Sequence, residues 1–188
     1  MGRILVIQFT TLDGVVEDPD GSDGTPHGGW AMRHGPQGVA GDKFRLGPIL
    51  EQGTLLFGRR TWEHFSTLWP HRDDEFSRAM NAATKAVVTH RPLEAEQWSN
   101  SSVIDAPLAE WAVARRGSTD LVVIGSQSVV AELAAKDLVD EYRLLVFPTA
   151  IGSGHRLFSA PAHFDLVRTE PVGPASLIVL RAASSRAH

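Results

Sequence analysis

The chain has 188 residues, of which 43% are hydrophobic and 21% are charged, as expected of one globular domain with a substantial core. Its formal net charge is −4 and no basic run is longer than an arginine pair, which argues against a nucleic-acid partner. The sequence has no cysteine, so disulfides, thiol nucleophiles and zinc–thiolate sites are excluded. Residues 1–7 start as a strand without the apolar region of a signal peptide, and no stretch approaches the ~20 apolar residues of a membrane span. We therefore expect a cytoplasmic protein with no membrane partner.

Short apolar runs rich in Val and Ile recur along the chain, a pattern typical of strands that are covered on both faces. They predict strands over 3–9, 54–57, 85–89, 102–104, 121–124, 142–147, 163–169 and 176–181. The segments between them predict helices over 42–52, 60–65, 73–82, 108–115 and 126–136. The order is mostly β-α-β, which predicts an α/β fold: a central, mostly parallel sheet with helices on both faces, in a single domain over 1–188. The last two strands are joined by a short loop at 170–175, so we expect an antiparallel edge there.

Two predicted strands end in the same way, at a glycine that is followed by polar residues opening a helix. The strand 54–57 leads into Gly58-Arg59-Arg60-Thr61, and the strand 121–124 leads into Gly125-Ser126-Gln127-Ser128. A helix start presents unpaired N–H groups and a partial positive charge, which suit an anion. Two such starts on neighbouring strands could hold a dinucleotide pyrophosphate, and the arginines suggest an extra phosphate. The alternative is a tight turn and helix cap with two solvated arginines.

The longest glycine-rich segment, residues 18–41, contains seven glycines and Trp30. A loop of this length in a compact domain is more often functional than idle, so we expect a lid with Trp30 as an aromatic wall of the substrate pocket. The alternative is a disordered insertion on a remote surface. The acidic residues at its start do not fit a calcium loop, and the eight histidines lack zinc-site spacing, so no metal site is expected. Asp13 precedes a glycine in a turn-like pair, and Asp42 is placed to cap the helix 42–52.

Five motifs in this order resemble the dihydrofolate reductase-like superfamily over nearly the whole chain. The resemblance is strongest to the branch that contains the C-terminal reductase domain of bacterial riboflavin biosynthesis. The motifs are Thr11-Leu12-Asp13-Gly14, Gly58-Arg59-Arg60-Thr61-Trp62-Glu63, residues 85–91, Val123-Ile124-Gly125-Ser126 and residues 148–158.

The resemblance implies an NADPH cofactor and gives roles to the motif residues. The pyrophosphate would be bound by Gly58, Arg59, Arg60 and Thr61, and the adenosine 2′-phosphate by Thr89, His90 and Arg91. The turn near the nicotinamide end would comprise Gly125, Ser126, Gln127 and Ser128, where the family often has Gly-Gly in place of Gly125-Ser126. Asp13 would lie near the nicotinamide and substrate, and Asp42 is the nearest candidate for the buried acid of folate reductases, although its surroundings do not match the folate pattern.

The expected function is an NADPH-dependent reductase that transfers hydride to a small planar or conjugated substrate, acting as a homodimer. Two alternatives remain open at this point. One is a pyrimidine reductase of riboflavin-type metabolism, and the other is a non-catalytic nucleotide-binding protein that keeps the fold.

Overall fold

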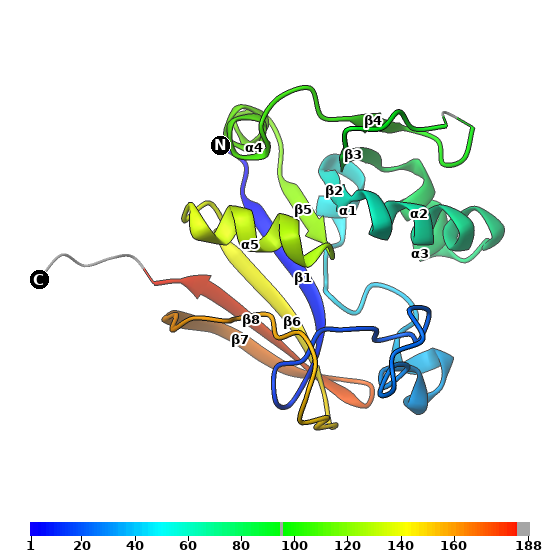
Figure 1. Ribbon diagram of the computed structural model, residues 1–188, viewed down its shortest axis with the longest axis vertical. Helices are drawn as coiled ribbons and strands as arrows, with labels where there is room; N and C mark the ends of the chain where they lie inside the picture. Colours follow the sequence, from blue (N-terminus) through cyan, green and yellow to red (C-terminus); the bar gives the residue numbers. More distant parts are fainter. Residues whose placement is uncertain (95, 184–188) are drawn as a thin grey trace, which may run out of the picture. The chain divides into compact units, whose positions relative to one another are not determined.

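The computed structural model describes residues 1–94 and 96–183. Eight strands form one mixed sheet in the order β4-β3-β2-β5-β1-β6-β8-β7 (Figure 1). The strands are β1 (Ile4–Thr11), β2 (Thr54–Gly58), β3 (Thr84–Val88), β4 (Ser101–Val103), β5 (Leu121–Ile124), β6 (Glu141–Phe147), β7 (Phe164–Val172) and β8 (Ala175–Ala182). The α-helices are α1 (Pro48–Gln52), α2 (Arg59–Leu68), α3 (Glu75–Ala82), α4 (Leu108–Arg116) and α5 (Gln127–Ala135). The predicted fold class is confirmed: the sheet is largely parallel, its C-terminal strands are antiparallel, and helices surround it.

The chain divides into two compact units. The first comprises Met1–Val6 and Arg45–Asp140, and the second comprises Ile7–Phe44 and the chain from Glu141 onward. The boundary falls inside β1, so this strand contributes residues to both units. That the chain behaves as the single domain suggested by the sequence stays a prediction.

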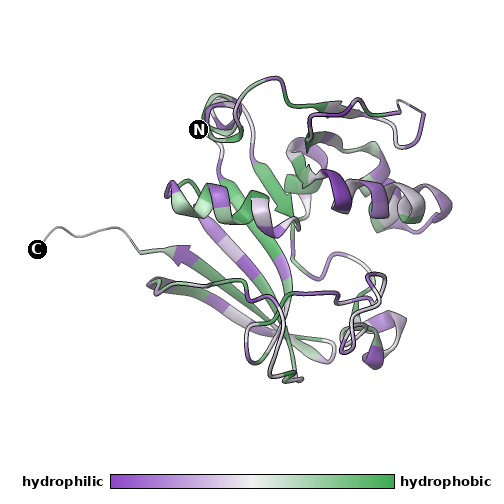
Figure 2. Cartoon of the chain, in the orientation of Figure 1, coloured by the Kyte–Doolittle hydropathy of each residue, from purple (hydrophilic) through white to green (hydrophobic). Residues whose placement is uncertain are grey.

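The first unit is built on the parallel strands β2, β3, β4 and β5. β2 pairs with β3 on one side and with β5 on the other, and β3 pairs with β4. Leu55, Leu56 and Phe57 on β2 are fully buried, as are the first three residues of β5. Figure 2 shows β5 hydrophobic along its length and α2 largely hydrophilic, which fits a strand covered on both faces and a helix with one face in solvent.

The predicted helix over 42–52 is wrong at its start. α1 begins only at Pro48, after a loop in which Arg45 and Gly47 both have positive φ values (56° and 50°). Such conformations break a right-handed helix, and proline is favoured in the first turn that follows. Gly47 is the N-cap residue, so the prediction that Asp42 caps this helix is also wrong. The other four helices lie where they were predicted; at the start of α3, Asp74 accepts a hydrogen bond from the backbone N–H of Ser77.

The second unit contains the antiparallel strands β6, β8 and β7. β8 pairs with β6 and with β7, and a two-residue turn, Gly173-Pro174, joins β7 to β8 as the predicted antiparallel edge requires. Phe147 at the end of β6 packs against Phe9 of β1, with ring centroids 5.5 Å apart. These rings form the core of the second unit together with Phe44, which stacks on Phe9 at 5.3 Å.

Candidate functional site

The first helix start of the predicted site lies where β2 runs into α2. Gly58 is both the last residue of β2 and the N-cap of α2, and the helix begins at Arg59. Glycine has no side chain with which to cap the helix, so the first backbone N–H groups of this ten-residue helix receive no hydrogen bond from it. This helix end can therefore bind an anion.

The second helix start lies where β5 runs into α5. Gly125 and Ser126 both have positive φ values, 62° and 52°, and Ser126 is the N-cap of α5. Its hydroxyl does not cap this helix, but lies 2.8 Å from the hydroxyl of Ser128. The backbone therefore keeps a conformation that glycine adopts freely, although serine stands at the position where the related family often has a second glycine.

The two helix starts touch. The N–H of Ser126 donates a hydrogen bond of 3.1 Å to the hydroxyl of Thr61, in the first turn of α2. A Cβ on Gly58 would lie 2.3 Å from Ser126 Oγ, and a Cβ on Gly125 would lie 3.3 Å from Thr61. Because β2 and β5 are adjacent and parallel, both helices begin at the same edge of the sheet. The structure thus brings together Gly58, Thr61, Gly125 and Ser126, as the sequence predicted, but their close approaches are to one another.

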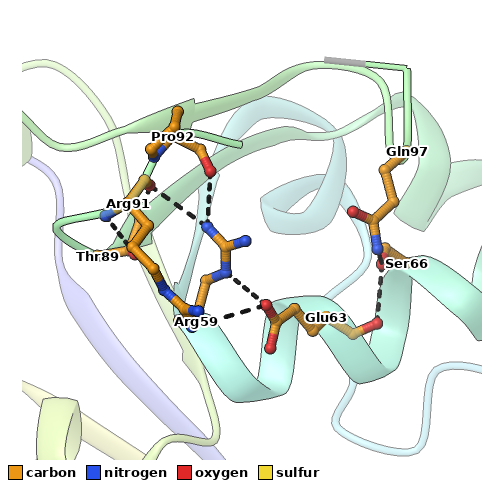
Figure 3. A network of polar contacts seen from close by, with 7 residues as sticks. All are labelled: Arg59, Glu63, Ser66, Thr89, Arg91, Pro92 and Gln97. Atoms are coloured by element: carbon orange, nitrogen blue, oxygen red, sulfur yellow. Dashed lines mark hydrogen bonds and ion pairs between the residues drawn. The ribbon is translucent and has the colours of Figure 1, made fainter. Parts of the chain in front are cut away.

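A network of polar contacts connects α2 with the residues after β3 (Figure 3). Arg59 Nε donates to Glu63 Oε1 at 2.6 Å, and Arg59 Nη1 donates to the carbonyl oxygens of Pro92 (2.8 Å) and Arg91 (3.3 Å). The Arg59 guanidinium carbon lies 5.7 Å from the centre of the Trp62 ring. Arg59 is therefore committed to holding the chain after β3 against α2.

Arg91 is in a different position from Arg59. Its side chain is 73% exposed, and its Nη2 lies 4.0 Å from Glu63 Oε1. The hydroxyl of Thr89 accepts a hydrogen bond of 3.1 Å from the Arg91 N–H, which fixes the turn that carries the guanidinium. His90 and Arg60 have exposed side chains, as do Gln127 and Ser128 at the start of α5. All the predicted phosphate-binding residues belong to the first unit.

Asp13, in the second unit, serves as a clamp for the loop after β6. Its carboxylate accepts hydrogen bonds from the Thr11 hydroxyl (2.6 Å) and from the backbone N–H groups of Gly152 (2.7 Å) and Ile151 (3.2 Å). The hydrogen bonds from Thr11 and Gly152 lower the pKa of Asp13 to about 2. The carboxylate is then ionised at neutral pH and has no proton to donate in this arrangement.

Trp30 does not line an open pocket in this structure. The indole is 0% exposed, packs edge-on against Phe147 at 5.6 Å, and donates its Nε1–H to the carbonyl of Glu17 at 2.9 Å. It has no exposed face in this conformation on which a substrate ring could stack, and its role as an aromatic wall of the substrate pocket stays a prediction. In this conformation Trp30 is a core anchor of the second unit.

The glycine-rich loop is held in a defined conformation and is not a disordered insertion. Asp18 is buried and accepts hydrogen bonds from the N–H groups of Asp23 (3.0 Å) and Thr25 (2.9 Å). Burial alone would raise the pKa of Asp18, but these hydrogen bonds outweigh it and lower the pKa. Gly28 lies close to the Asp18 carboxylate: a Cβ added at Gly28 would sit 2.0 Å from Asp18 Oδ2, which explains a glycine there. Asp42, half-buried in the loop that follows, remains a candidate proton donor.

Sequence reasoning gave no role to two charged residues of the first unit. Glu63 stands four residues after Arg59, a spacing that favours an ion pair on a helix and could have drawn attention to it. Lys85 is 0% exposed, and its Nζ donates to the carbonyls of Asn81, Ala83 and Ser99 at 2.8–3.0 Å. The apolar pattern of β3 does not predict that its lysine is fully buried.

The second unit also contains an ion pair beside a small cavity. Glu17 pairs with His155 at 2.6 Å beside this cavity of about 150 Å³, which Val15, His27 and Gly154 also line. Among the residues that the structure describes, no group of three or more His, Cys, Asp or Glu side chains could hold a metal ion. No helix within that part is both long and apolar enough to cross a membrane.

Solved structures with the same fold come from several bacteria. A protein of Shewanella sp. PV-4 that carries a riboflavin biosynthesis name is 18% identical, with a TM-score of 0.69, and the match covers 97% of this chain and 99% of that one. RibD of Acinetobacter baumannii is 14% identical, with a TM-score of 0.63, and the match covers 98% of this chain and 59% of that one. Dihydrofolate reductase of Enterococcus faecalis, solved with NADP(H) and RAB-propyl, is 16% identical, with a TM-score of 0.59, and the match covers 97% and 98% of the two chains.

No curated protein sequence matches this chain closely enough to count as a relative. The family model described as the RibD C-terminal domain matches residues 3–178, which is nearly the whole chain. The order of motifs around Asp13, Gly58 and Gly125 had indicated this family from the sequence. The chain belongs to the family of the RibD C-terminal domain.

Proposed function

We propose that this protein is an NADPH-dependent reductase that transfers hydride to a small planar or conjugated substrate. The observation that carries the proposal is the pair of touching helix starts, α2 and α5, at the ends of two adjacent parallel strands. Their first N–H groups and helix dipoles suit the two negative charges of a pyrophosphate. Membership of a family of reductase domains supports the same reading.

Different residues of the first unit would serve different parts of such a nucleotide. Thr61 fixes the two helix starts relative to each other through its hydrogen bond with Ser126, so the site is formed before a ligand arrives. Arg91 offers an exposed guanidinium suited to a phosphate monoester, and Arg60 adds a second positive charge at the start of α2. When bound, the nicotinamide would supply the hydride, and the protein's part is to orient it and to exclude water.

The candidates for the donor of the proton that accompanies hydride transfer are Asp13, Asp42 and water. With a pKa of about 2, Asp13 is ionised at neutral pH and works as an anchor of residues 151–152. Asp42 and water are the other candidates for the donor.

The family match favours one more specific candidate, a pyrimidine reductase of riboflavin-type metabolism. The substrate of such an enzyme is a planar heterocycle, which agrees with the broader proposal. A non-catalytic nucleotide-binding protein with the same fold is the remaining alternative, and the experiment below separates it by turnover.

The test measures nucleotide binding first and turnover second. Calorimetry or fluorescence titration should show NADPH binding at least tenfold tighter than NADH, a difference of about 1.4 kcal/mol. Thr61→Val removes the hydroxyl that accepts the Ser126 N–H and should weaken both nucleotides, because the helix starts are no longer fixed. Thr67→Val is the matched control: its hydroxyl bonds only within α2, to the carbonyl of His64 at 2.7 Å, and binding should stay unchanged.

Failure of the parent protein to bind either nucleotide would refute the proposed function. Binding without NADPH oxidation against a panel of pyrimidine, pteridine and quinone acceptors would favour the non-catalytic alternative.

A further inference from the structure

Glu63 lies between Arg59 and Arg91 (Figure 3). Its Oε1 contacts Arg59 Nε at 2.6 Å and lies 4.0 Å from Arg91 Nη2. One carboxylate thus faces two guanidinium groups. The two contacts are unequal, because the first is a short hydrogen bond and the second is at the limit of an ion pair.

The contact with Arg59 is locked in place. Arg59 is only 21% exposed, and it also donates to the carbonyls of Arg91 and Pro92. The backbone of Glu63 is fixed as well, because Ser66 Oγ donates to the Glu63 carbonyl at 2.8 Å and Gln97 Nε2 donates to Ser66 Oγ at 2.7 Å. Glu63 therefore cannot move far from its position beside the turn at residues 89–92.

The contact with Arg91 is the loose one. Arg91 is 73% exposed, so a phosphate monoester can reach its guanidinium from solvent and replace Glu63 as its partner. An exposed ion pair of this length stabilises the protein only weakly, and a phosphate dianion can bind the guanidinium more strongly. A carboxylate that remains beside a bound phosphate repels it and so weakens its binding.

We propose that Glu63 is a specificity-determining residue, an internal counter-ion of Arg91 that weakens the binding of a nucleotide 2′-phosphate and so limits the preference for NADPH over NADH. This inference rests on the proposed function and assigns different roles to the two arginines. Arg91 binds the 2′-phosphate, whereas Arg59 positions the turn that carries Arg91. Glu63 does not lower the affinity for NADH, because NADH has a hydroxyl group where NADPH has the 2′-phosphate.

The experiment compares the affinities of NADPH and NADH in the parent protein and in Glu63→Gln, Arg91→Gln and the double variant. Glutamine keeps a carbonyl that accepts from Arg59 Nε, so the turn stays in place, and thermal unfolding checks this. Glu63→Gln should bind NADPH about three- to tenfold more tightly and NADH within twofold of the parent. Arg91→Gln should lose at least tenfold in NADPH affinity only, and the double variant should show no gain over Arg91→Gln.

Smaller probes and a matched charge change complete the design. Adenosine 2′,5′-bisphosphate should repeat the gain seen with NADPH in Glu63→Gln, and 5′-AMP should not. Glu110→Gln on α4 makes the same change of charge away from this network and should leave every affinity unchanged.

The outcomes separate the two proposals. If the parent binds NADPH and Glu63→Gln binds it no better, or gains equally for NADH, the role of Glu63 is overturned and the proposed function stands. If the parent binds neither nucleotide, both are overturned.

Discussion

At the scale of single residues, several charged side chains in this protein hold the backbone in place. Asp13 ties the residues after β6 to the end of β1, and Lys85 ties three carbonyl groups together inside the first unit. The sequence pointed to Asp13 through its turn-like setting, but it could not show which N–H groups the carboxylate accepts. It gave no hint of Lys85, because only the fold brings Asn81, Ala83 and Ser99 around the same amine.

The clamp at Asp13 should make the stability of the second unit sensitive to acid. Its pKa is lowered from 3.8 to about 2, so the stabilisation is fully present above pH 3.8 and is lost as the pH falls through 2. Asp13→Asn should lower the free energy of unfolding at pH 7, and the gap to the parent should shrink toward pH 2. Urea unfolding at a series of pH values measures this. A gap that is independent of pH would contradict the clamp.

Lys85 should show a pH dependence of the same sign as Asp13, but in the alkaline range. Burial lowers its pKa from 10.5 to about 8, so between these values the unfolded chain binds more protons than the folded one. The contribution of this group to stability should therefore rise as the pH increases from 8 to 10.5. Lys85→Met should lack this slope, and it should be destabilised by at least ~2 kcal/mol at pH 7 because three buried carbonyls lose their donor. A variant as stable as the parent would show that water replaces the amine.

At the scale of secondary structure, the junctions β2–α2 and β5–α5 interlock. Gly58 is required because the side chain of Ser126 occupies the space where its Cβ would lie. Gly125 has a positive φ and approaches Thr61, so a bulky replacement there would disturb the fold before any ligand bound. Within the part of the chain that the structure describes, these glycines serve the packing of the two helix starts.

This interlock predicts that a second substitution rescues the first. Gly58→Ala should destabilise the protein by roughly 1–3 kcal/mol, because the new Cβ would lie 2.4 Å from the Cβ of Ser126. Ser126→Gly removes the side chain that the new methyl group would meet and relieves a φ of 52°. The double variant should therefore recover most of the lost free energy of unfolding in urea titrations. Additive losses would show that the two residues do not touch in solution.

Strands and helices could be predicted from the sequence where the local spacing of apolar residues alone determines them. All eight strands were found, several of them because their apolar runs are continuous. In contrast, α1 was started too early because the apolar spacing of Phe44 and Leu46 imitates a helix. The positive φ values of Arg45 and Gly47 that break it are invisible in that spacing. The burial of Trp30 was not predictable for a related reason: a tryptophan among glycines suggests an open lid, and only the packing on Phe147 shows a buried ring. The predicted roles of the remaining site residues stay predictions.

At the scale of the whole molecule, β1 is the strand that the two units share. Ile4, Leu5 and Val6 belong to the first unit and are fully buried, and the strand continues without a break from Ile7 into the second. Neither unit can lose this strand without loss to the other, so we expect the chain to unfold in one cooperative step, as a single domain does.

Tryptophans buried in the two units allow this expectation to be tested. Trp30 reports on the second unit, and Trp62 and Trp98 report on the first. In urea titrations of protein labelled with 5-fluorotryptophan, the fluorine signals of all three should change with the same midpoint. NADPH at a hundredfold excess over its Kd should add about 2.7 kcal/mol to the stability seen by every probe, although its proposed site lies in the first unit alone. A Trp30 signal that unfolds at its own midpoint and ignores NADPH would show two independent domains, because a ligand stabilises only the unit whose unfolding releases it.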